Sequence, residues 1–315
     1  MLFDRNQMLT FSGSGGARQQ RMSESNEGRA RRKAAFDMMN VRTGDRILDL
    51  GCGGGFFVKD LAMSVGNTGS VVALDSSDPQ IEAARATCAD LTNVEYVKCS
   101  ASHLPFDDAS FDSIVSIQTL EYIPEVDAVL KECARVLKPG RLFVSISVMW
   151  DHFRVHGADE ALTDKMLGIF RGHCAHQNLP VDLPAKLEPL SFIGVQQVPI
   201  PIYLNTFHCN SFGNLASGAI REYAKNSGKM TDAEIEKWDA SLAKAVAENR
   251  FAFCSFPVVT AAALNPQKLR LPPAIGAYAS PPPSAPGHPS PSSALPRARE
   301  KAQGGGMGFL AWFMK

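Results

Sequence analysis

The chain has 315 residues, 45% of them hydrophobic, which suits one large domain or two small ones with a sizeable core. Its 32 Lys and Arg balance 32 Asp and Glu, so no overall field favours nucleic acid or an anionic membrane. The seven cysteines show no CxxC pair or zinc-finger spacing, which argues against metal, and no apolar stretch reaches the length of a membrane span.

Residues 1–28 are polar, rich in Gly and Ser and without periodicity, which predicts a disordered N-terminal tail. They lack the apolar segment of a secretory signal, and an odd number of cysteines fits a reducing compartment, so we expect a cytoplasmic protein. The Arg- and Ser-containing start leaves import into an organelle open. Regular structure is expected from Arg29, with a short basic helix ending at Asn40.

Residues 45–150 alternate short apolar runs with longer amphipathic ones. Helical spacing of apolar residues is seen in 56–65, 78–91 and 125–138, and strands are expected at 46–50, 70–75, 94–99, 112–118 and 141–148. Asp78 before Pro79 is typical of an N-cap followed by proline in the first turn. This alternation predicts a parallel sheet covered by helices on both faces, an α/β fold.

The following residues, 151–264, are expected to complete the same domain. A capping box at 231–234 predicts a helix that runs to about Asn249. Two further strands, 192–204 and 250–264, are expected to pair and close the sheet. Half of the prolines lie between 266 and 296, which predicts that 265–315 is an extended, disordered tail, either inert or a ligand for a proline-recognition module.

The stretch "DLGCGGG" at 49–55 places glycines on a strand-to-helix turn. No Lys-Ser/Thr pair follows Gly55, which excludes a P-loop, and Phe56 stands where a dinucleotide fingerprint needs glycine. The remaining pattern, GxGxG, lets a backbone approach a ligand closely beside free helix N–H groups. Asp75 ends the next strand, where an acid can accept hydrogen bonds from a ribose diol, and we expect Asp78 to cap the helix and leave Asp75 free.

These segments, with "CSASHLPF" and "LEYIP" downstream, resemble class I S-adenosylmethionine-dependent methyltransferases, nearest to the branch with ubiquinone/menaquinone-biosynthesis, sterol and arsenite enzymes. The resemblance is strong over 29–150 and weaker to about 262. It implies a doubly wound, mostly parallel seven-stranded Rossmann-like sheet. Residues 29–150 would form the S-adenosylmethionine-binding core, and 151–264 would supply a helical acceptor lid and the closing strands.

The resemblance also implies which residues bind the cofactor, S-adenosyl-L-methionine. Ser100 replaces the aspartate that usually reads the adenine amino group, and a neutral hydroxyl accepts a weaker hydrogen bond. The expected set is Asp49, Gly51, Cys52, Gly53, Gly55, Asp75, Ser76, Ser100, Ala101 and Gln118.

Methyl transfer from a sulfonium does not require a general base, so the catalytic residues stay open. The expected partner is a small-molecule methyl acceptor, with no nucleic acid; the oligomeric state stays open. A quinone-, sterol- or arsenite-type acceptor and a non-catalytic methyltransferase-like binding protein are the alternatives. Acceptor-side candidates are Glu121, Tyr122, Asp151 and His152, with His156, His173 and His176 as weaker ones.

Overall fold

A computed structural model describes residues 13–267 and contains a seven-stranded sheet in the order β3-β2-β1-β4-β5-β10-β7. The first five strands run parallel, and β10 runs antiparallel to both of its neighbours. This architecture confirms the predicted fold class. The strands are β1 (Arg46–Leu50), β2 (Ser70–Asp75), β3 (Val94–Lys98), β4 (Phe111–Ile117), β5 (Leu137–Val148), β7 (Phe192–Pro199) and β10 (Pro257–Leu264).

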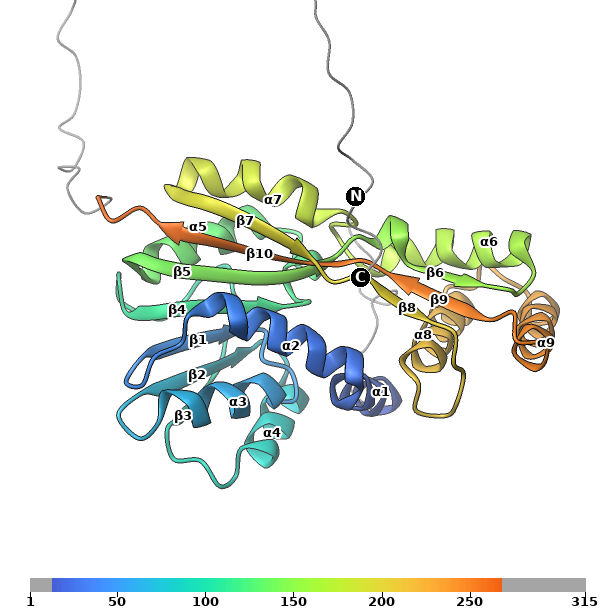
Figure 1. The fold of residues 1–315 in the computed structure, drawn as a ribbon, viewed down its shortest axis with the longest axis horizontal. Helices are drawn as coiled ribbons and strands as arrows, with labels where there is room; N and C mark the ends of the chain where they lie inside the picture. Colours follow the sequence, from blue (N-terminus) through green and yellow to red (C-terminus); the bar gives the residue numbers. More distant parts are fainter. Residues whose placement is uncertain (1–12, 268–315) are drawn as a thin grey trace, which may run out of the picture. The chain divides into compact units, whose positions relative to one another are not determined.

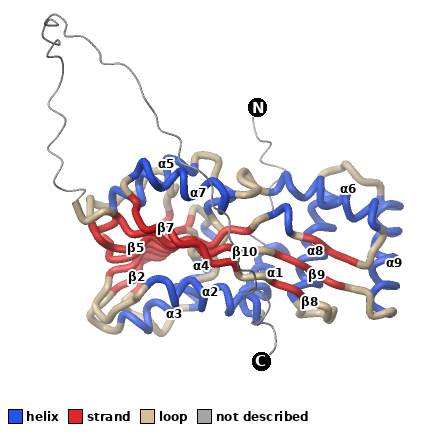
Figure 2. The backbone as a smooth tube through the Cα atoms, turned by 45° about the horizontal axis from the view of Figure 1, so that its top comes forward, coloured by secondary structure: helices blue, strands red, loops and turns tan. Residues whose placement is uncertain are grey.

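Helices cover both faces of this sheet (Figures 1 and 2). On one face lie α2 (Asn26–Met39), α3 (Phe56–Val65) and α4 (Asp78–Thr87); on the other lie α5 (Val126–Val136) and α7 (Leu179–Leu187). Two separate clusters of buried apolar side chains fill the spaces between sheet and helices. Strands buried on both faces explain why the runs at 46–50 and 70–75 are almost continuously apolar.

A second sheet has the order β6-β9-β8, from β6 (Arg154–His156), β9 (Ala252–Ser255) and β8 (Ile202–Leu204). It packs with α6 (Glu160–Phe170), α8 (Phe212–Asn226) and α9 (Asp232–Ala247) around its own apolar cluster (Figure 1). The predicted capping box is present at the start of α9, where Thr231 and Glu234 bond each other's backbone N–H.

The two predicted C-terminal strands each pass through both sheets. Residues 192–204 divide into β7 and β8, and 250–264 divide into β9 and β10. Pro201 has no N–H for a ladder, and Phe256 turns its carbonyl to the amide of Met149. Predicting one strand in each place was therefore wrong, although the predicted pairing is present in both sheets.

Predicting disorder over 1–28 was wrong for the residues that the structure describes there. Residues 13–24 form α1 (Gly13–Glu24), which contacts α2 and α8 (Figure 1). Glycines at 13, 15 and 16 disfavour a helix locally, so tertiary contact must supply its stability. Gly28 permits the close turn between α1 and α2, because a Cβ there would lie 2.4 Å from the Met22 carbonyl oxygen. Residues 1–12 and 268–315, including most of the predicted proline-rich tail, lie outside the described residues.

None of the helices within 13–267 has the length and apolarity needed to cross a membrane.

Candidate functional site

The glycine turn connects β1 to α3 at the carboxyl edge of the large sheet. Gly51, Gly53 and Gly55 all have positive φ, which a residue with a side chain rarely adopts. A Cβ on Gly51 would lie 2.2 Å from the Thr119 hydroxyl oxygen, and one on Gly55 would lie 2.8 Å from the Ala84 Cα. The turn therefore needs glycine both for its backbone conformation and for close packing against neighbouring elements.

Asp75 fixes this turn from the end of β2. Its Oδ2 accepts a hydrogen bond from the Gly53 amide (3.1 Å), and its Oδ1 accepts one from the Ser77 amide (3.0 Å). The cap residue of α4 is Ser77, and Asp78 is the first helical residue. The prediction that Asp78 caps the helix and leaves Asp75 free was wrong. The Asp75 carboxylate instead lies against the glycine turn and accepts a hydrogen bond from it.

Asp49, at the end of β1, is 2% exposed. Its Oδ2 is buried and has no hydrogen-bond partner among residues 13–267. Burial, and then the nearby charge of Asp75, raises the pKa of Asp49 to about 7. A buried carboxylate oxygen with no donor is costly, so this position is suited to a ligand that brings a donor or a positive charge.

A cavity of about 190 Å³ opens over the glycine turn. Of the predicted cofactor residues, Asp49, Gly51, Cys52, Gly53 and Gln118 line it. Gly55, Asp75, Ser76, Ser100 and Ala101 are not among the lining residues. Ser76 and Ser100 are exposed, and the Ser100 hydroxyl lies 2.8 Å from that of Ser102. The assignment of these ten residues to a cofactor stays a prediction.

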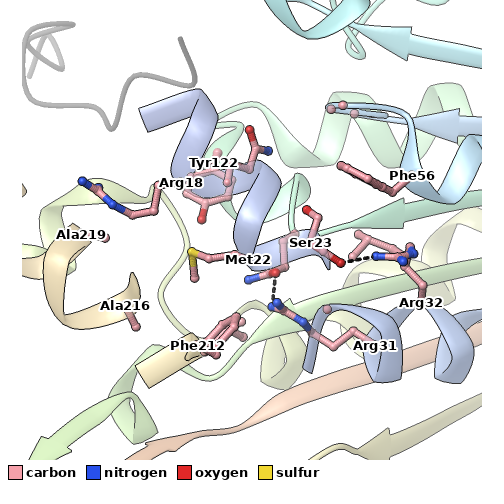
Figure 3. A pocket seen from close by; sticks show the side chains of 18 of the residues that line it. Arg18, Met22, Ser23, Arg31, Arg32, Phe56, Tyr122, Phe212, Ala216 and Ala219 are labelled. Carbon is pink, nitrogen blue, oxygen red and sulfur yellow. Dashed lines mark hydrogen bonds between the residues drawn. The ribbon is translucent and has the colours of Figure 1, made fainter. Parts of the chain in front are cut away.

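Helices α1 and α2 form a wall of the cavity that the sequence did not reveal. Figure 3 shows Met22 of α1 and Arg31 of α2 directed toward Phe212 of α8. Arg31 is 5% exposed, bonds the Gln118 side chain and lies 4.9 Å from the centre of the Phe212 ring. Within the described residues it forms no ion pair, and burial lowers its pKa to about 10. The only available signal was the basic run at 29–33.

The four acceptor-side candidates occupy three different environments. Tyr122 lines the cavity. Glu121 is fully buried behind it, where its carboxylate accepts from the Ser147 hydroxyl at 2.9 Å. Asp151 and His152 are exposed and are not among the lining residues; Asp151 pairs with Arg171 at 3.1 Å. The structure therefore does not bring these four side chains together around one point.

Aromatic side chains from the second sheet region supply the opposite wall. Trp150, in the short helix η3 (Trp150–His152), lies 4.9 Å from the Phe153 ring centre and 4.3 Å from that of His173. His173, in η4 (Arg171–His173), stacks on Phe170 at 4.1 Å. All four line the cavity. The site thus combines a polar glycine turn with an apolar, aromatic wall, a lining that is typical of small-molecule sites.

Residues 48–145 match the protein family described as "Methyltransferase domain". Demethylmenaquinone methyltransferases of Staphylococcus saprophyticus and Staphylococcus epidermidis are 36% and 38% identical to this chain over 115 residues. Each match covers 36% of this chain and 49% or 48% of the relative. The chain thus spans about half the length of the curated relatives it matches.

Solved structures share the fold at lower identity. The YcgJ protein of Bacillus subtilis is 18% identical with a TM-score of 0.50, over 75% of this chain and 99% of its own. Phosphoethanolamine N-methyltransferase 2 of Haemonchus contortus, solved with S-adenosyl-L-methionine, is 17% identical with a TM-score of 0.53, over 84% of this chain and 59% of its own. Residues 48–145 thus match a methyltransferase domain, and the chain shares its fold with these two solved structures.

Proposed function

We propose that this protein transfers a methyl group from S-adenosyl-L-methionine to a small-molecule acceptor bound against the aromatic wall. The observation that carries the proposal is a buried acid and a buried base on one cavity, Asp49 and Arg31, neither of which forms an ion pair within 13–267. They match the ammonium and carboxylate groups of an amino acid, which is the methionine end of the cofactor. The glycine turn on the same cavity lets a ligand lie against backbone, because its glycines have no side chains.

The other predicted residues would serve the adenosyl end. Asp75 would accept hydrogen bonds from the ribose hydroxyls, and Ser76 and Ser100 would lie near the adenine. The bound cofactor supplies a methyl group on a sulfonium, which can transfer by in-line displacement to an acceptor atom held in the correct position. The protein's task is then to orient the acceptor and to exclude water, which the aromatic wall and the α1–α2 wall can do.

A quinol-type acceptor is the finer candidate. The curated relatives carry the name demethylmenaquinone methyltransferase, and the rings of Trp150, Phe153 and Phe170 offer a flat apolar surface. Incubation of the protein and methyl-labelled cofactor with a cell extract, followed by mass analysis, would identify the product. A labelled quinol precursor supports this acceptor class, whereas labelled protein or RNA contradicts a small-molecule acceptor.

Calorimetry with S-adenosylhomocysteine tests the cofactor assignment. We expect Asp75→Asn to weaken binding by about tenfold or more, because one neutral amide oxygen replaces the two oxygens of a charged acceptor. Asp78→Asn is the matched control, since Asp78 is exposed and pairs only with Lys98 among the described residues. No binding by the wild-type protein contradicts the proposal. Binding without any methylated product would instead indicate a non-catalytic binding protein.

A further inference from the structure

Two buried polar atoms on the aromatic wall have no partner in the described part of the chain: Trp150 Nε1 and His173 Nε2. Trp150 is 7% exposed and His173 is 1% exposed, so neither atom is compensated by bulk water. Buried polar groups of this kind are rare, and each one needs an explanation. Both residues line the cavity above the glycine turn, and both lie beyond the matched domain at 48–145.

The hydrogen-bonding roles of the two atoms are complementary. An indole Nε1 can only donate. His173 Nδ1 lies 2.6 Å from the Phe170 carbonyl oxygen, which can only accept, so Nδ1 carries the hydrogen and Nε2 presents a lone pair. Burial lowers the pKa of His173 to about 4, so the ring stays neutral near pH 7. The wall therefore offers one donor and one acceptor, on two rings whose centres are 4.3 Å apart.

We propose that Trp150 and His173 together hold a hydroxyl group of the methyl acceptor, which donates to His173 Nε2 and accepts from Trp150 Nε1. This inference rests on the proposed function. A hydroxyl can satisfy both atoms at once, because it donates one hydrogen bond and accepts another. The rings of Phe153 and Phe170 surround the pair, so the molecule that carries the hydroxyl is apolar and uncharged near it. Trp150 and His173 thus determine acceptor specificity and need not move a proton.

Matched phenols and their methyl ethers provide the test. Phenol and 2-naphthol carry the hydroxyl, whereas anisole and 2-methoxynaphthalene cannot donate. Calorimetry on the full chain, with S-adenosylhomocysteine present, should show at least about tenfold tighter binding of a phenol than of its ether, because the ether leaves His173 Nε2 unpaired. Equal affinity for both members of each pair, or no binding of any of the four, overturns the proposal.

Variants assign the preference to these residues. Asparagine at 173 can keep the bond to the Phe170 carbonyl but cannot reach the Nε2 position, and phenylalanine at 150 keeps the ring without the donor. We expect His173→Asn to abolish the preference for phenols and Trp150→Phe to weaken the binding of phenols by about fivefold or more. His156→Asn, at an exposed histidine on β6, should change neither. An unchanged preference in His173→Asn, or unchanged binding of phenols in Trp150→Phe, overturns the proposal.

Two further measurements separate this inference from its alternatives. Trp150 and His173 also line a second cavity, beside α6, that includes Asp164. If Asp164→Asn abolishes the preference, the hydroxyl binds in that second cavity and the proposal is overturned. Affinity for S-adenosylhomocysteine, measured on the same samples without phenol, should be equal in wild type and both wall variants. If the wild type does not bind S-adenosylhomocysteine, the methyltransferase proposal is refuted. The preference for phenols would still show whether Trp150 and His173 bind a hydroxyl.

Discussion

Glu121 keeps a carboxylate in the protein interior, between β5 and the cavity wall. It accepts hydrogen bonds from the Ser147 hydroxyl and, at 3.4 Å, from the Val148 amide. Burial is the main reason that its pKa rises to about 7, and these hydrogen bonds and Arg31 oppose the rise only in part. A carboxylate in this position is more easily explained as part of the support beneath Tyr122 than as a group that contacts the acceptor.

Glu121→Gln should change the pH dependence of stability. Between pH about 4.5 and about 7 the folded protein keeps a proton on Glu121 that the unfolded chain has released, so wild-type stability falls as pH rises through this window. Glutamine does not titrate, so the variant avoids this loss of up to roughly 3 kcal/mol in the free energy of unfolding. We expect a higher melting temperature for the variant than for wild type at pH 8 and no gain at pH 4.5. Exposed Glu125→Gln is the control, and a variant that is less stable at pH 8 contradicts the prediction.

Single residues of the site were predictable where local chemistry dictates them. Gly51 and Gly53 were recognisable because only glycine adopts their backbone conformation readily, and Asp49 because it ends a strand beside them. Arg31 could not be singled out as a cavity residue, and His173 was only one of seven acceptor-side candidates. Their roles depend on burial and on neighbours more than 50 residues away, such as Gln118 for Arg31 and Tyr122 for His173, and local spacing records neither.

At the scale of elements, α1 is held across the cavity by two side-chain contacts. Arg18 donates to Glu222 of α8, and the Gln80 amide of α4 donates to Gln19 at 2.7 Å. The helix also contributes Met22 and Ser23 to the cavity wall (Figure 3). Because its glycine-rich start is a poor helix former, these contacts must account for much of its position.

Charge reversal tests whether α1 closes the site. We expect Arg18→Glu to weaken S-adenosylhomocysteine binding by roughly fivefold, since the helix loses its ion pair and meets a like charge on α8. Glu222→Arg combined with Arg18→Glu should restore most of the affinity, because the pair is re-formed in the opposite sense. Calorimetry on the wild type, the two single variants and the double variant completes the cycle. A double variant as weak as Arg18→Glu would show that the ion pair is not what holds α1.

The elements of the sheet were predictable because two signals agree in them. Residues 56–65 show helical spacing and form α3, and the apolar runs 46–50 and 70–75 form β1 and β2. The breaks in the last two strands had a local signal that the prediction did not use, because Pro201 lies in one break and Pro257 directly follows the other, and proline has no N–H for a central strand. Which sheet a strand joins depends on its partners, and local composition does not specify those.

For the whole molecule, the large sheet is built from both halves of the described chain. Strand β5 ends the matched domain region, and β10, more than 100 residues later, pairs with it from Pro257↔Val148 to Ala263↔Leu142. Strand β7 then pairs with β10. The matched region by itself would therefore expose the unpaired edge of a buried strand, which favours aggregation.

Truncated chains test whether the first half of the described chain folds without the second half. A chain that ends at Trp150 loses β7 and β10, and we expect it to aggregate or to show no cooperative unfolding. A chain that ends at Gln267 keeps every strand in the described range, and it should unfold in one transition at the melting temperature of the full chain. Calorimetric scans compare the two with full length. A cooperative transition in the shorter chain would show that residues 46–150 fold without the later strands.

The passage of two paired strands through both sheets determines which part of the wall can move. Hydrogen bonds bracket both crossings: the Ile200 amide donates to the Pro257 carbonyl, and the Met149 amide donates to the Phe256 carbonyl. No free loop remains there for a hinge, so the aromatic wall is joined rigidly to the sheet that carries the glycine turn. Helix α1, by contrast, is joined by a few side-chain contacts and one short turn. Entry and exit of ligands should therefore occur past α1, and its amide hydrogens should exchange faster than those of β9.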